Sequence, residues 1–188
     1  MDKFILFAQP WWVNIFAITP FLAYYLWHKK KLNIPKSILV YVAIFGVAFG
    51  FVEASVVVYL RTAIGLILGK GVLALGAYQQ AQILSALPSN LWAIEFFREA
   101  TTLVMLMAVA LIASKITRER WAMFLWAGAF WDTFYYIFLF ITIQWPSSLL
   151  SPDVLFLIPV PWFSQVWYPI LISLLTISCV LASNKTKK

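Results

Sequence analysis

The sequence predicts an all-α, polytopic membrane helix bundle with five transmembrane helices and a short interfacial helix in the last outer loop. Three observations lead to this prediction. The 188 residues are 63% hydrophobic and only 11% charged, whereas a soluble domain has roughly 25% charged residues. The apolar residues form runs of about 20, the length that crosses a bilayer. The basic residues are grouped in short clusters between these runs.

The five spans form a single transmembrane domain, 1–188, with no length left for a soluble one. They are predicted at about 11–27, 37–60, 91–114, 121–143 and 163–181. Pro20 lies within the first span, which a membrane helix tolerates where neighbours bond to the freed carbonyl. This run ends, rather than begins, with basic residues, so we expect an uncleaved span and not a signal peptide.

Two segments are harder to assign. The stretch 62–90 is apolar but contains Lys70, four glycines and a pair of glutamines, and it is predicted as an outer loop or a membrane-surface segment. After the fourth span, Ser151, Pro152 and Asp153 have the features of a helix start: a capping residue, a first-turn proline and an acid. Pro159 would stop that helix, so it is too short to span and is predicted to be interfacial.

The basic clusters decide between five spans and six. They are Lys29, Lys30, Lys31 and Lys36; Lys115, Arg118 and Arg120; and Lys185, Lys187 and Lys188. Five spans place all three on one side, as the positive-inside rule requires, whereas a sixth span over 64–78 would separate the first from the others. We therefore expect a bacterial or archaeal cytoplasmic membrane, with the N-terminus outside and the C-terminus cytoplasmic.

Ionisable residues lie inside the predicted spans. These are Glu53, Glu95, Arg98, Glu99 and Asp132, with Arg61 at a helix end. A central carboxylate or Arg costs roughly 2.5–3.5 kcal/mol on insertion scales, so such residues face the bundle interior and mark a functional site by default. At about 1.5 Å per residue, three helices place a carboxylate roughly 10 to 16 Å below the outer surface. Asp2 and Glu119 are expected in water, and Asp153 at the outer surface.

Helical spacing groups these residues on shared faces. Glu95, Arg98 and Glu99 are three and four residues apart, so they share one face of the third span. Gly46 and Gly50 form a small-xxx-small pattern that predicts a close helix contact leading to Glu53.

A second stripe lies on the fourth span. Asp132, Tyr135 and Tyr136 share a face there, and the two phenols could donate hydrogen bonds to the carboxylate.

The charge balance allows a functional or a structural interpretation. Arg98 can neutralise Glu95 or Glu53, and Arg61 can pair with Asp153 or a lipid headgroup, as in ion-pair networks that have no function. Four acids against two arginines nevertheless leave an excess of negative charge, so we expect at least one acid to hold a proton or a cation.

Other chemistries have little support in the sequence. One histidine, His28, and one cysteine, Cys179, exclude bis-histidine haem and a cysteine-ligated cluster, so no such cofactor is expected. A metal, if any, would be a hard divalent ion at Glu53, Glu99 and Asp132. No phosphate-binding loop or nucleic-acid signature occurs.

Three functions remain as hypotheses. The first is transport or other handling of a proton, cation or cationic ligand at the carboxylate cluster, reached from the outer side. The second is an accessory or structural subunit of a larger membrane complex. The third is a membrane enzyme that acts on a lipid or isoprenoid, with Arg98 or Arg61 holding an anionic headgroup. The expected partners are the lipid bilayer and either further copies of the chain or a membrane complex.

Overall fold

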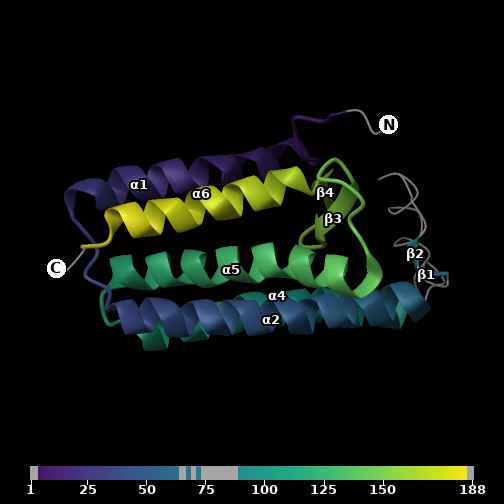
Figure 1. Cartoon of the computed structure of the whole chain (residues 1–188), viewed down its shortest axis with the longest axis horizontal. Helices are drawn as coiled ribbons and strands as arrows, with labels where there is room; N and C mark the ends of the chain where they lie inside the picture. Colours follow the sequence, from purple (N-terminus) through teal and green to yellow (C-terminus); the bar gives the residue numbers. More distant parts are fainter. Residues whose placement is uncertain (1–3, 64–66, 69–70, 73–88, 186–188) are drawn as a thin grey trace.

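The structure is a computed structural model that describes residues 4–63, 67–68, 71–72 and 89–185. Its long helices run side by side along the long axis of the molecule (Figure 1), so the predicted helical bundle is confirmed. In chain order the elements are a 3-10 helix η1 (Trp11–Ile18), α1 (Thr19–Lys29), α2 (Lys36–Ala63), β1 (Ile67–Leu68), β2 (Gly71–Val72), α4 (Ser89–Ala113), α5 (Thr117–Ile143), β3 (Pro152–Phe156), β4 (Trp162–Gln165) and α6 (Trp167–Ser183).

Within the described residues, three helices are long and apolar enough to cross a membrane: α2, α4 and α5. The helix α6 is shorter, at 17 residues, and the first helical segment is divided between η1 and α1. Pro20 lies in the first turn of α1, where its missing N–H costs no helical hydrogen bond. On α4, Phe97, Val104 and Ile112 are exposed, an outer face suited to lipid. The helices therefore fit an integral membrane protein.

The helix α5 is the centre of the bundle. It packs against α2 and α4 on one side and α6 on the other, while α1 lies along α6 (Figure 1). Met123, Trp126 and Leu139 of α5 are buried in the contacts. Because α5 contacts α2, α4 and α6, its polar side chains can reach several different helices.

A β-hairpin occupies the position of the predicted interfacial helix, so that prediction is wrong. Strand β3 pairs antiparallel with β4, and Asp153 lies opposite Ser164. The fifth predicted span also begins too early, because its first residues belong to β4. A run of five apolar residues is too short to distinguish a helix from a strand, and Pro152 is tolerated at the first position of a strand as well as of a helix.

The described residues of the basic clusters lie at the opposite end of the bundle from this hairpin (Figure 1). The Lys31 ammonium donates to the Ala182 carbonyl at 3.0 Å, and Arg118 donates to the Lys31 carbonyl at 3.1 Å. Glu119 is buried there, contrary to prediction: it accepts from the Ser114 hydroxyl at 2.6 Å. These bonds join the α1–α2 connection, the α4–α5 connection and the end of α6.

Only part of the segment 62–90 is described. Strands β1 and β2 form a short antiparallel pair, so a continuous helix over 64–78, as six spans would need, is not formed. Residues 64–66, 69–70 and 73–88, including Lys70, lie outside the described part of the chain, and the assignment of this segment as an outer loop or a membrane-surface segment stays a prediction.

The backbones of α2 and α5 approach closely where α2 has glycine. A Cβ added at Gly46 would lie 2.8 Å from the Ala127 carbonyl oxygen. One added at Gly50 would lie 2.8 Å from the Trp131 oxygen and 3.0 Å from the Tyr135 nitrogen. Because these obstacles are backbone atoms, a side chain at either position would force the helices apart.

Replacing Gly50 by alanine should destabilise the bundle, whereas the same change at Gly128 should not. Gly50→Ala is expected to lower the free energy of unfolding by about 1–3 kcal/mol, the usual cost of overpacking. A Cβ at Gly128 meets nothing within 4 Å, so Gly128→Ala should gain up to about 1 kcal/mol of helix propensity. Thermal unfolding of both variants in detergent measures the difference. Equal stability would show that the α2–α5 contact can accommodate a methyl group.

Candidate functional site

Arg98 is held between two carboxylates from different helices. Its Nη1 donates to Oε2 of Glu53 on α2 at 2.6 Å, and its Nε donates to Oε2 of Glu95 at 2.8 Å. A second bond from Nη2 reaches the other oxygen of Glu95. This two-pronged geometry is the strongest form of the Arg–carboxylate pair. Glu53 and Glu95 are both buried, so the pairing joins α2 to α4 inside the bundle.

Glu99 lies on the same face of α4 but has a different kind of partner. Its Oε2 accepts the backbone N–H of Leu157 at 2.7 Å. Leu157 is buried in the connection between β3 and β4, so the hairpin reaches inward to α4. Among the described residues, Glu99 has no ion-pair partner. It is thus a buried carboxylate with a neutral donor.

Asp153 is the centre of a third contact, at the C-terminal end of α2. Its Oδ1 lies 3.3 Å from Nη2 of Arg61, and its Oδ2 accepts the Tyr136 hydroxyl at 3.0 Å. The Arg61 guanidinium also lies 3.9 Å from the ring centroid of Trp145, a cation–π geometry. Asp153 was predicted at the outer surface, yet it is only 2% exposed, because the hairpin folds back between the helices.

Asp132 faces away from the Arg98 contacts. Its Oδ2 accepts the hydroxyl of Ser173 on α6 at 2.8 Å. The predicted tyrosine stripe divides: Tyr136 donates to Asp153, while Tyr135 lies with its backbone against Gly50 of α2. Positions one turn apart on a central helix have different neighbours, which helical spacing alone does not reveal.

These contacts form separate groups. Arg98 joins Glu53 and Glu95, and Glu99 lies on the same face of α4. Asp153 joins Arg61 and Tyr136, whereas Asp132 contacts Ser173. The predicted site residues are therefore divided among separate contacts, and Asp132 is not joined to the Arg98 pairing.

The arrangement does not provide a metal centre. In the part of the chain that the structure describes, no group of three or more His, Cys, Asp or Glu side chains could hold a metal ion. In particular, Glu53, Glu99 and Asp132 are not assembled as a ligand set, because Glu53 binds Arg98 and Asp132 faces α6. A hard divalent cation needs several oxygen ligands around one point.

Sequence reasoning missed several members of the site. Asp153 was treated as a surface residue, although its pairing with Arg61 was one of the alternatives considered. The Leu157 N–H, Ser173 and Trp145 carried no signal, because an apolar or hydroxyl residue in a span or loop is ordinary. Compared with protein-family models, curated proteins and solved structures, the chain matches none. What the site does is therefore inferred from its own geometry.

Asp153 should make stability fall as pH rises from about 4 to about 6. Burial raises the pKa of this carboxyl to about 6 from 3.8, against the opposing effects of Arg61 and Tyr136. Within that window the folded state binds the proton more tightly than the unfolded state, so raising the pH costs stability, up to about 3 kcal/mol for a shift of this size. The unfolding free energy of the wild type minus that of Asp153→Asn, measured in detergent at each pH, should decrease across the window and level off above it. A constant or rising difference would contradict this assignment.

Proposed function

We propose that this chain is a multi-pass membrane protein that handles protons at an intramembrane carboxylate cluster, reached from the end of the bundle that holds the β3–β4 hairpin. The observation that carries the proposal is Glu99, a buried acid whose described partner is a backbone amide. Such a group in low dielectric avoids a large desolvation cost by holding a proton.

The local charge count supports a proton rather than a metal ion. The described site contains two arginines, Arg61 and Arg98, and five carboxylates, those of Glu53, Glu95, Glu99, Asp132 and Asp153. Both arginines are already paired, and Glu99 and Asp132 accept only from neutral donors among the described residues. A proton removes excess negative charge without the multi-ligand geometry that a metal requires.

The partner expectations follow from size. A single bundle of 188 residues is small for a transporter, so the proposal includes self-association or assembly with a larger membrane complex. In this proposal η1 with α1, α2, α4, α5 and α6 supply the five spans.

A structural role as an accessory subunit is the second candidate, and Arg98 favours it. Its three hydrogen bonds to Glu53 and Glu95 are complete within the chain, as in a pair that only joins helices. The third hypothesis, a lipid- or isoprenoid-modifying enzyme, has less support, because Arg61 and Arg98 would have to leave their carboxylates to hold a headgroup.

The proposed orientation places the basic end in the cytoplasm and the hairpin outside. The α1–α2 connection, the α4–α5 connection and the C-terminal end of α6 lie at one end of the bundle (Figure 1), and they carry the described residues of the three basic clusters. The positive-inside rule assigns such an end to the cytoplasm of a bacterial or archaeal cell. The carboxylate cluster then faces the outer half of the bilayer.

Glu99 should carry a proton at neutral pH. Infrared spectroscopy of the protein in lipid should show the carbonyl stretch of a protonated carboxyl, and Glu99→Gln should remove it because the neutral amide holds no such proton. The matched control is Glu119→Gln, which should leave the band unchanged. Glu119 is also buried, but it lies at the basic end in the first turn of α5, where the positive end of the helix dipole stabilises a carboxylate. An unchanged band in Glu99→Gln would leave Glu99 ionised and remove the basis of the proposal.

The same variants separate proton handling from a structural role. In vesicles loaded with a pH-sensitive dye, the wild type should dissipate an imposed proton gradient, and Glu99→Gln and Asp132→Asn should reduce the rate to that of empty vesicles. Glu119→Gln should keep the wild-type rate. If folded Glu99→Gln and Asp132→Asn proteins behave as the wild type does, the accessory-subunit interpretation replaces this one.

Labelling should place positions 30, 115 and 185 on the cytoplasmic side and position 149 on the other. Single cysteines are introduced at these positions in a Cys179→Ala background, and a membrane-impermeant thiol reagent is applied to intact cells and to opened ones. The first three should react only after opening. Because Asp153 is buried, position 149 in the exposed turn before β3 serves as the outer control. Reaction of positions 30 and 149 from the same side would contradict the orientation.

A further inference from the structure

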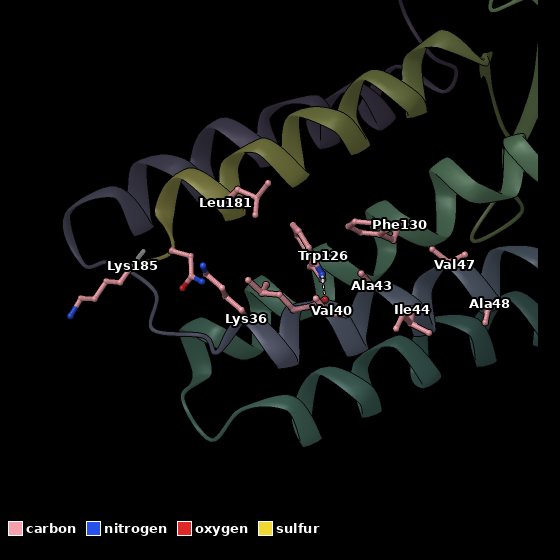
Figure 2. A pocket seen from close by; sticks show the side chains of 12 residues that line it. Lys36, Val40, Ala43, Ile44, Val47, Ala48, Trp126, Phe130, Leu181 and Lys185 are labelled. Carbon is pink, nitrogen blue, oxygen red and sulfur yellow. Dashed lines mark hydrogen bonds between the residues drawn. The ribbon is translucent and has the colours of Figure 1, made fainter. Parts of the chain in front are cut away.

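A groove runs along the bundle between α2 and α6, with α5 as its floor. It has a volume of about 650 Å³, within the range of small-molecule sites. Apolar side chains line most of its length, including Ala43, Val47, Phe130 and Leu181, and Lys36 and Lys185 stand at its end (Figure 2). None of the described carboxylates of the site lines the groove, which begins at the basic end of the bundle.

Hydrogen bonds hold the walls of this groove in place. The Trp126 indole N–H donates to the Leu39 carbonyl at 2.9 Å, which fixes α5 against α2 (Figure 2). At the end of the groove, Asn184 accepts the Ile34 N–H at 3.0 Å and donates to the Ile34 carbonyl at 2.9 Å. These bonds join the end of α6 to the residues that precede α2. The groove is therefore a feature of the fold and does not depend on one flexible side chain.

The charged side chains that line the groove are positive. Among the described residues, the charged ones that line it are Lys36 and Lys185, and none is acidic. A ligand that is complementary to the groove has an anionic group that can pair with the lysines and a long apolar part that can pack against the apolar side chains. Basic pockets between membrane helices on the cytoplasmic side are typical sites for anionic lipid headgroups.

We propose that this groove binds one anionic glycerophospholipid, with an acyl chain along Ala43, Val47 and Phe130 and the phosphate between Lys36 and Lys185. The apolar part of the groove lies along the helices, at the depth of the lipid tails in the surrounding bilayer. The two lysines lie at the helix ends, at the depth of the lipid headgroups. A lipid entering from the bilayer needs no passage through water. The site is independent of the proton chemistry proposed above.

Native mass spectrometry of the full chain in detergent measures the binding of phosphatidylglycerol and so tests the headgroup contact. The double variant Lys36→Gln/Lys185→Gln should weaken binding roughly 30-fold, from about 1 kcal/mol for each lysine near an anionic lipid. The control is Lys29→Gln/Lys30→Gln, which removes the same charge from exposed residues at the same end that do not line the groove. Equal effects of the two double variants would overturn the proposal.

Two further arms test the apolar contact. Ala48→Trp should fill the groove and weaken phosphatidylglycerol binding, whereas Ala108→Trp, on an exposed position of α4, should not. Glycerol 3-phosphate, which has the anionic group without the chain, should bind far more weakly than the lipid. Unchanged lipid binding in a folded Ala48→Trp protein, equal binding of glycerol 3-phosphate, or equal binding of phosphatidylcholine would each overturn the proposal.

Discussion

The close contact between the backbones of α2 and α5 determines where the polar groups of the other helices lie. At Gly46 and Gly50 the backbone of α5 leaves no room for a side chain on α2. The next residue on that face of α2 is Glu53, about one turn beyond Gly50. Arg98 of α4 reaches it there at 2.6 Å. The outer part of the same contact directs Tyr136 toward the hairpin, where it meets Asp153. A wider separation of α2 and α5 would break this series of contacts.

The acids of the site form two classes. Glu53, Glu95 and Asp153 have arginine partners, so their charge is compensated where it lies. Glu99 and Asp132 have a backbone amide and a hydroxyl. In low dielectric the first class can stabilise the joining of helices only if the geometry is good, whereas the second is costly while ionised. The proton-handling proposal depends on the second class, and the structural alternative on the first.

Much of the site was predictable because helical spacing is a local property. The common face of Glu95, Arg98 and Glu99 follows from their separation along the chain, and in the structure Arg98 donates a hydrogen bond to Glu95. Local signals failed for Asp153. Its Ser-Pro-Asp context fits a helix start or a strand start equally well, and only the pairing of β3 with β4, which joins residues on either side of a turn, decides between them.

The sequence by itself determined the membrane class, the approximate helices and the grouping of basic residues, because hydrophobicity and charge act residue by residue. The tertiary structure alone decided which acid pairs with which donor. Asp132 bonds to Ser173 and Tyr136 bonds to Asp153, although Asp132 and Tyr136 are one turn apart on α5. The reason is physical: a central helix is surrounded by several elements, and a hydrogen bond requires a donor within about 3 Å, a distance that packing sets and residue spacing does not.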